Sequence, residues 1–348
     1  MTITQVRILR LAMGTSISLW VSQLFSWPLS FVAPVITMFL LALPLPALKP
    51  KGAIAFVLVM LGSLYAGALL LPAITYYPAV GLLLLVLALF WSFYFTALGG
   101  SQIVGTFATL GIAMTTAIGS TSIDAVFMLA NALTFSTAVG IVFVWIAHAI
   151  LPDYKAIDAP PPGPAGKPPA KEVDLGEARW SAFRSLLIVF PVALWFLLSP
   201  SSSAYLPVMI KVASMGQQAT NDDTRDAARS LVMSTLIGGA GAVIAWQVLA
   251  IVPTLTMYTL LIALAALIFG PRIFKGAGMH PDGATWSYAF LTMIVILAPA
   301  VMDSIAGGPA AAKSFDRLIM FVGTAFYAVI AVYVTDAIRP ATSAEKPA

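Results

Sequence analysis

Long apolar runs separated by short polar turns dominate this sequence. Hydrophobic residues make up 60% of the 348 residues, and charged residues make up only 9%. Soluble domains carry roughly 25% charged residues, so this chain has too few polar side chains to cover a surface in water. A membrane-spanning helix needs about 20 mostly apolar residues, and many of the runs approach this length. The sequence therefore predicts an all-α integral membrane protein.

Twelve of these runs are candidate spans. They lie at 8–26, 29–48, 53–71, 79–98, 102–119, 124–151, 182–199, 204–219, 230–251, 254–270, 284–302 and 315–337. The first is predicted to be a membrane helix rather than a cleaved signal peptide, because no small-residue cleavage site follows it. The eighth is short and contains Lys211.

The basic residues predict the orientation. With the N-terminus in the cytoplasm and twelve spans, all of the 18 Lys and Arg residues except Lys313 and Arg317 fall on the cytoplasmic side. Cytoplasmic loops of membrane proteins carry such an excess of positive charge. Both termini are therefore predicted to be cytoplasmic.

The chain divides into two halves. A Pro-rich segment with mixed charges has the composition of a solvated linker. In each half an Arg (Arg10, Arg184) precedes an apolar run, and a Pro (Pro34, Pro207) follows 24 or 23 residues later. This pattern predicts two parallel six-helix repeats related by an axis along the membrane normal. The expected parts are a first repeat at 1–151, a cytoplasmic linker at 152–181, a second repeat at 182–338 and a tail at 339–348.

Several function classes find no support in the sequence. The chain has no cysteine and two histidines, His148 and His280, and no carboxylate cluster accompanies them, so no metal site is expected. There is no phosphate-binding loop of the GxxxxGK(S/T) kind. The basic residues lie in short loops without an aromatic–basic face, which argues against nucleic-acid binding. The sequence thus predicts neither an enzyme nor a cofactor.

Proline interrupts two corresponding spans. Pro28 and Pro34 flank and interrupt the second span, and Pro200 and Pro207 do the same in the eighth. Breaks of this kind in lipid persist where they line a cavity, and paired breaks in two repeats point to a transport site. The alternative is that proline is simply common in membrane helices.

Three basic residues are candidates for attracting an anion. Lys211 follows Pro207 by one helical turn in an apolar setting, where a cation at depth is expected to face the bundle interior. The alternative places Lys211 near the cytoplasmic interface. Arg10 and Arg184 are expected either to line the cytoplasmic mouth or to act as plain interfacial anchors.

The candidates for proton coupling are few. Asp124, Asp303 and Asp316 lie at or near membrane depth, and His148 lies near the inner end of the sixth span. Histidine titrates near neutral pH. The alternatives are a polar cap for His148 and, for Asp316, an interfacial ion pair.

Two stretches resemble a known family. RLAMGTSISLW followed by WPLSFVAPVITMFLLALP, and GQQATNDDTRDAARSLVMSTLIGGAGAVIAW, are similar to the fusaric acid resistance and aromatic acid exporter (FUSC) family. The second stretch resembles the family's pattern of a polar GxT stretch, an Arg and then a (G/S)T…G helix. The matching positions are Gly216, Thr220, Arg229, Ser234, Thr235 and Gly238.

The resemblance implies an efflux protein of the bacterial inner membrane. Members are thought to export aromatic carboxylic acids together with a periplasmic membrane-fusion adaptor. The expectation is therefore a secondary exporter of small organic acids driven by the proton-motive force. An organic anion channel built as a pseudo-dimer, or a scaffold subunit of an efflux assembly, are the alternatives, and homo-oligomerisation stays open. The expected substrate-binding residues are Arg10, Pro34, Arg184, Pro207, Lys211 and Arg229.

Overall fold

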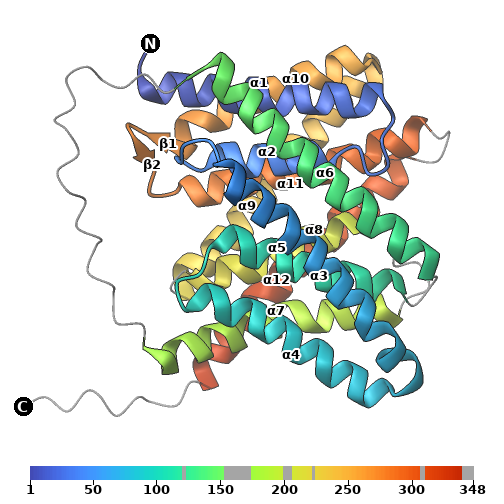
Figure 1. The fold of residues 1–348 in the computed structure, drawn as a ribbon. Helices are drawn as coiled ribbons and strands as arrows, with labels where there is room; N and C mark the ends of the chain where they lie inside the picture. Colours follow the sequence, from blue (N-terminus) through green and yellow to red (C-terminus); the bar gives the residue numbers. More distant parts are fainter. Residues whose placement is uncertain (120–122, 153–173, 199–205, 222–223, 306–309, 339–348) are drawn as a thin grey trace, which may run out of the picture.

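The computed structural model describes residues 1–119, 123–152, 174–198, 206–221, 224–305 and 310–338, which form twelve α-helices and one short β-hairpin (Figure 1). The helices up to residue 152 are α1 (Ile3–Leu24), α2 (Val32–Ala42), α3 (Pro50–Tyr76), α4 (Pro78–Ala97), α5 (Gln102–Gly119) and α6 (Ile123–Ile150). The later elements are α7 (Leu175–Leu198), α8 (Leu206–Asn221), α9 (Thr224–Ile251), α10 (Leu255–Ile273), β1 (Phe274–Lys275), β2 (Gly278–Met279), α11 (Gly283–Ile305) and α12 (Ala310–Ile338).

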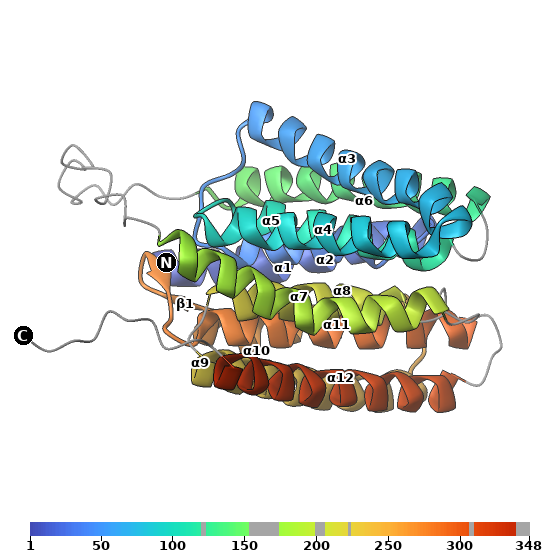
Figure 2. The same ribbon diagram turned by 90° about the horizontal axis from the view of Figure 1, so that it is seen from below.

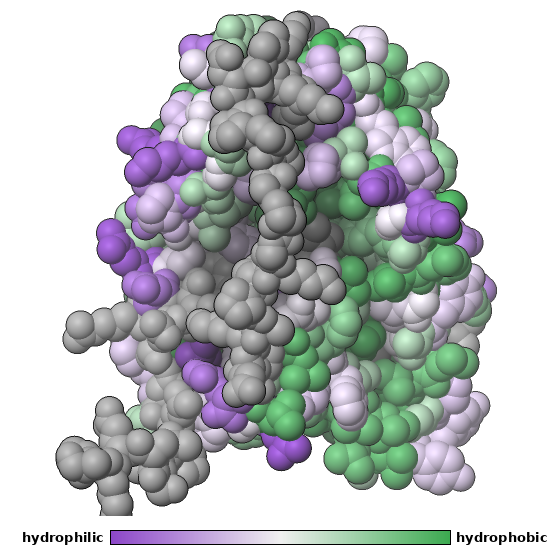
Figure 3. Space-filling view, turned by 60° about the vertical axis from the view of Figure 1, so that its left-hand side comes forward, coloured by the Kyte–Doolittle hydropathy of each residue, from purple (hydrophilic) through white to green (hydrophobic). Residues whose placement is uncertain are grey.

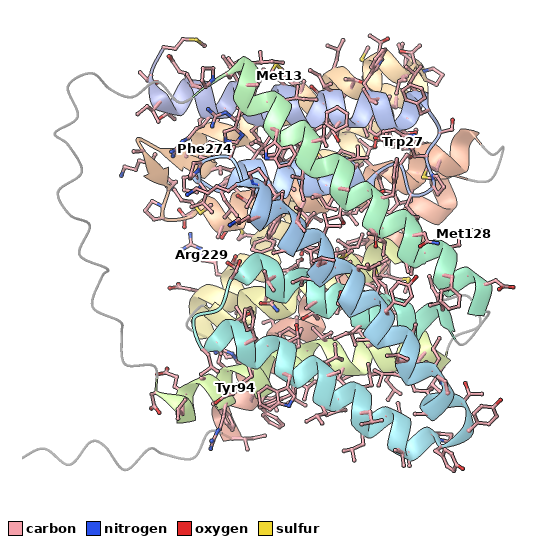
Figure 4. All side chains as sticks on the ribbon, viewed as in Figure 1. Met13, Trp27, Tyr94, Met128, Arg229 and Phe274 are labelled. Atoms are coloured by element: carbon pink, nitrogen blue, oxygen red, sulfur yellow. The ribbon has the colours of Figure 1, made fainter. Side chains whose placement is uncertain are left out.

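The helices run roughly side by side, so the bundle has two ends (Figure 2). We call the end with the start of α1 and the β1–β2 hairpin the near end, and the opposite one the far end. The last turn of α12 also lies at the near end (Figure 2). Arg229 and Phe274 lie at the near end, whereas Trp27 and Met128 lie toward the far end (Figure 4).

Among the described residues, seven helices are long and apolar enough to cross a membrane. They are α3, α4, α6, α7, α9, α10 and α11. Large apolar side chains point outward from them, including Leu69 and Ile251, which are 79% and 81% exposed. In Figure 3, hydrophobic residues cover much of the visible surface and hydrophilic residues gather in patches. This pattern is that of a multi-pass helical membrane protein whose outer surface faces lipid.

Four helices form the interior of the bundle. These helices are α2, α5, α8 and α11. Helices α8 and α11 pack against each other; α8 also packs against α5, and α11 also packs against α2. Every described side chain from Val208 to Gln217 in α8 is buried, as is every side chain from Ser287 to Ala300 in α11. Polar side chains within these two stretches therefore face protein rather than lipid.

Helix α2 is much shorter than the expected span at 29–48. It has 11 residues and ends where Leu43 turns to an extended conformation (φ −81°, ψ 136°). Pro44 follows Leu43, and a residue before proline is pushed out of the helical region. A helix of this length is only about 16 Å long. The chain at 43–49 continues without helical structure to α3.

The predicted linker is too long at its C-terminal end. We expected it to extend to residue 181, but α7 begins at Leu175. The carboxylate of Asp174 accepts a hydrogen bond from the backbone N–H of Gly176 (2.8 Å), which satisfies one of the free donors at the start of the helix. Ala178 and Ala182 are buried, so packing against the bundle stabilises this early turn. Residues 153–173 lie outside the described residues.

Candidate anion site at Lys211

Lys211 lies in the centre of the protein. It belongs to α8, which packs against α4, α5, α7, α9, α11 and α12, and its side chain is 0% exposed. Lysine is almost never fully buried without a partner. The side chain is therefore enclosed by other helices and faces the interior of the bundle.

The depth of Lys211 follows from two helices independently. Lys211 precedes Asn221, the last residue of α8, by ten residues, which corresponds to about 15 Å along the axis. Its partner Ser234 follows Thr224, the first residue of α9, by ten residues and therefore lies at the same depth, about 15 Å. Lys211 and Ser234 therefore lie at the same level of the bundle, about 15 Å along the helix axes from its near end.

The ammonium of Lys211 has one described hydrogen-bond partner. It donates to the hydroxyl of Ser234 over 3.2 Å. Within the described residues no carboxylate lies at ion-pair distance from Lys211, and no cluster of three or more His, Asp or Glu residues could hold a metal. Since an ammonium has three donors, two remain for a ligand. The arrangement is chemically suited to a small anion.

Further buried polar side chains follow α8 toward the near end. The Ser214 hydroxyl donates to the Lys211 carbonyl (2.6 Å), and the Gln217 amide donates to the Thr109 hydroxyl of α5 (3.3 Å). Sequence reasoning missed Ser214, Gln217 and Thr109. For Ser214 and Gln217 the signal was their spacing of three and six residues from Lys211, because residues at i, i+3 and i+6 form one ridge of a helix.

The structure gives Arg10 a different set of partners. It is 3% exposed in α1, and its Nε and Nη2 atoms donate to the carbonyl oxygen of Leu151 (3.0 and 2.5 Å), directly after the end of α6. The C-terminus of a helix carries partial negative charge and free carbonyls, and a cation stabilises both. This contact favours an anchoring role for Arg10. Arg184 is also buried, at 7% exposed, in α7, which packs against α8.

Arg229 lies apart from Lys211, in a pocket at the near end of the bundle (Figure 4). The pocket has a volume of about 410 Å³ and is lined by α9 and by the start of α11. Asp226 and Asp282 also line it, together with Trp286, over which the Arg272 guanidinium stacks at 4.4 Å. Charges of both signs therefore surround Arg229, so its environment is not purely anion-attracting.

The two prolines do not break helices. Pro34 is the third residue of α2, and Pro207 is the second residue of α8. Backbone N–H groups in the first turn of a helix have no acceptor within the helix, so a proline there costs no hydrogen bond. Each proline therefore lies at the start of a helix and does not interrupt one. Pro34 is buried. The predicted interruptions at Pro34 and Pro207 are thus corrected to two short helices that start at equivalent places; Pro200 falls outside the described residues.

The candidate proton-coupling residues are dispersed. Asp124 is exposed in the first turn of α6, where a carboxylate complements the positive end of the helix. His148 lies near the opposite end of α6, and its Nδ1 is 2.9 Å from the Val144 carbonyl oxygen. The side chains of Asp303 and Asp316 lie outside the described residues.

The fold and the buried side chain define a class: a polytopic, all-helical membrane protein with a lysine enclosed among its helices. Residues 7–147 match a family described as a protein of unknown function (DUF2955). The match ends within the last turn of α6, so it covers the first six helices and stops before the linker. No curated protein and no solved structure matches the chain.

Proposed function

We propose that this protein is a secondary transporter that exports small organic anions across the bacterial inner membrane. The observation that carries the proposal is Lys211, a fully buried ammonium with a single described partner, Ser234. A charge at mid-membrane depth is costly unless it is paired, and ionisable residues at such depth usually belong to a transport pathway. A transported carboxylate supplies the missing negative charge.

The proposed architecture is two like-oriented six-helix repeats. Matching helices support it by their lengths: 27 and 28 residues for α3 and α9, 20 and 19 for α4 and α10, and 28 and 29 for α6 and α12. Packing supports it as well, since α1 packs on α10 and, reciprocally, α7 packs on α4. The end of the family match within the last turn of α6 agrees with a six-helix unit. Twelve spans with both termini in the cytoplasm follow from this arrangement and from the basic residues.

The substrate class rests on the resemblance to the aromatic acid exporters, which suggests aromatic carboxylates. The proton-motive force is the proposed source of energy, and a periplasmic membrane-fusion adaptor is the proposed partner. Benzoate is the simplest probe of this class. It carries one carboxylate for the Lys211 ammonium and one aromatic ring.

The test is benzoate transport into or out of proteoliposomes. Wild-type protein is expected to move radiolabelled benzoate faster than empty vesicles, and an imposed pH gradient is expected to accumulate it. Lys211→Met, which keeps length but removes charge, is expected to slow transport by about tenfold or more, since a hydrogen bond to a charged group contributes about 1.5–3 kcal/mol. Lys211→Arg is the matched control that retains the charge.

The same measurement separates the alternatives. Electrogenic benzoate flux that ignores the pH gradient would replace the exporter by an anion channel. Wild-type vesicles as slow as empty ones would contradict both and leave the scaffold role. Equal rates in wild type and Lys211→Met would remove Lys211 from the site.

A further inference from the structure

The buried polar side chains of α8 form a continuous ridge. Lys211, Ser214 and Gln217 are spaced by three residues, and each is 0% exposed. Gln217 lies four residues, or about 6 Å, from the near end of α8, while Lys211 lies ten residues, or about 15 Å, from it. The ridge therefore leads from the near end of the bundle to the candidate anion site.

A cluster of polar groups from α4 and α5 meets the outer end of this ridge. The Gln217 amide donates to the Thr109 hydroxyl (3.3 Å), and the hydroxyls of Thr109 and Ser92 are hydrogen-bonded to each other (2.8 Å). Ser92 also donates to the carbonyl of Gly105 (3.0 Å). Gly105 has no side chain, and a Cβ there would lie 2.0 Å from the Thr96 hydroxyl and 3.1 Å from the Gln217 amide. Backbone and polar side chains thus crowd into one seam between α4, α5 and α8.

The equivalent seam of the other half is apolar. When positions are counted from the first residue of each helix, four polar or small residues correspond to four apolar ones. The pairs are Ser92 with Phe269, Gly105 with Trp286, Thr109 with Phe290, and Gln217 with Leu43. Phe269 packs against Trp286 and Phe290 with ring centroids 5.7 and 5.8 Å apart, so aromatic rings fill the interface between α10 and α11.

The ridge shows the same difference between the halves. By the same count, the counterparts of Lys211 and Ser214 are Thr37 and Leu40 in α2, and the counterpart of Gln217 is Leu43, which follows the last residue of α2. Thr37 uses its hydroxyl within its own half, bonding to Ser18 and to the carbonyls of Ala33 and Gly140. The α2 side therefore offers no continuous polar line toward the near end among the residues that the structure describes.

We propose that anions reach Lys211 by one route only, the seam between α4, α5 and α8, and that Gln217 positions them there. The proposal rests on the function proposed above and adds the path and its asymmetry. The amide of Gln217 and the hydroxyls of Thr109, Ser92 and Ser214 are neutral donors that a carboxylate can use in turn. In the described state the Gln217–Thr109 hydrogen bond closes the seam. This hydrogen bond breaks when an anion passes through the seam.

Single cysteines test the route without relying on transport. The natural chain has no cysteine, so Thr109→Cys and the matched Phe290→Cys each carry one thiol. A small anionic methanethiosulfonate added on the near side is expected to modify Thr109→Cys at least about tenfold faster than Phe290→Cys, because a charged reagent without polar partners is costly to place among apolar rings. Benzoate is expected to slow the modification of Thr109→Cys. Equal rates at the two positions would overturn the single route.

A transport measurement tests the role of Gln217. Gln217→Leu copies the residue of the apolar seam and is expected to lower the benzoate flux about tenfold. Thr37→Val is the matched control, because it removes a buried interhelical hydrogen bond outside the seam, and its flux is expected to stay near that of wild type. Gln217→Asn, which keeps the amide, is expected to retain more flux than Gln217→Leu.

The outcomes distinguish this proposal from the function on which it rests. If wild type moves benzoate and Lys211→Met does not, while Gln217→Leu matches wild type and Thr109→Cys is unreactive, the route is wrong and the anion site stands. If wild type moves no benzoate, the proposed function itself fails.

Discussion

The ammonium of Lys211 donates a 3.2 Å hydrogen bond to the hydroxyl of Ser234, across the buried interface between α8 and α9. The pair joins a residue of a short central helix to one of the long apolar helices on its flank. Both side chains are 0% exposed. The hydrogen bond therefore stabilises the buried position of both side chains.

Removing the hydroxyl of Ser234 is expected to disturb Lys211. Ser234→Ala leaves the ammonium without its described partner, which is expected to lower the free energy of unfolding by about 1–3 kcal/mol. In a double-mutant cycle with Lys211→Met, the two losses are expected to be non-additive by about 1 kcal/mol, because the second change removes a contact that is already gone. Unfolding of the detergent-solubilised variants measures this. Strict additivity would show that the hydrogen bond contributes nothing.

Arg10 is expected to act on stability and not on anion binding. Arg10→Ala removes the donors that hold the Leu151 carbonyl at the end of α6, so the free energy of unfolding is expected to fall by about 1.5–3 kcal/mol. The KM for benzoate is expected to stay unchanged in the folded fraction. A raised KM for benzoate with unchanged thermal stability would contradict the anchoring role and indicate that Arg10 binds the substrate.

Two glycines are expected to respond to alanine in opposite ways. A Cβ at Gly238 in α9 would lie 2.3 Å from the Ala289 carbonyl oxygen of α11, whereas a Cβ at Gly323 in α12 meets nothing within 4 Å. Gly238→Ala forces these helices apart and is expected to cost about 1–3 kcal/mol. Gly323→Ala is expected to be neutral or to stabilise by about 0.5–1 kcal/mol, because alanine favours the helix.

Thermal unfolding in one detergent compares these two variants directly. Similar behaviour of Gly238→Ala and Gly323→Ala would contradict the close approach of α9 and α11. Gly62→Ala is a second control, since its site in α3 is equally open.

Cysteine accessibility is expected to fix the orientation. Lys275→Cys lies in the hairpin at the near end, and Tyr77→Cys lies in the turn between α3 and α4, where the side chain is 70% exposed. A membrane-impermeant maleimide is expected to label Tyr77→Cys in intact spheroplasts and Lys275→Cys only after permeabilisation. The reverse pattern would invert the proposed topology.

Hydropathy predicted an all-α membrane protein correctly, because lipid imposes long apolar helices. Hydropathy failed to predict the helix boundaries that individual residues determine. Pro44 ends α2 early, Asp174 starts α7 seven residues before the expected span, and Pro34 fits a first helical turn that hydropathy cannot distinguish from an interior.

The site was only partly predictable. An isolated lysine in an apolar run indicated an interior charge, but its depth depended on where α8 begins and on the pairing with Ser234. Arg10 looked equivalent to an anion-binding residue because the sequence does not show that Leu151 lies beside it. Gln217 and Thr109 were missed because the sequence does not show which helices pack together. A single polar residue in an apolar helix indicates a site only once its partner on the neighbouring helix is known.

Binding of benzoate to the purified protein tests the central claim most directly. A ligand that binds only the folded state stabilises it by about 2.7 kcal/mol at 100 times its Kd. The account predicts that benzoate raises the Tm of wild type and of Lys211→Arg, and that it leaves the Tm of Lys211→Met unchanged. An equal rise in wild type and Lys211→Met, or no rise in either, would contradict an anion site at the buried ammonium.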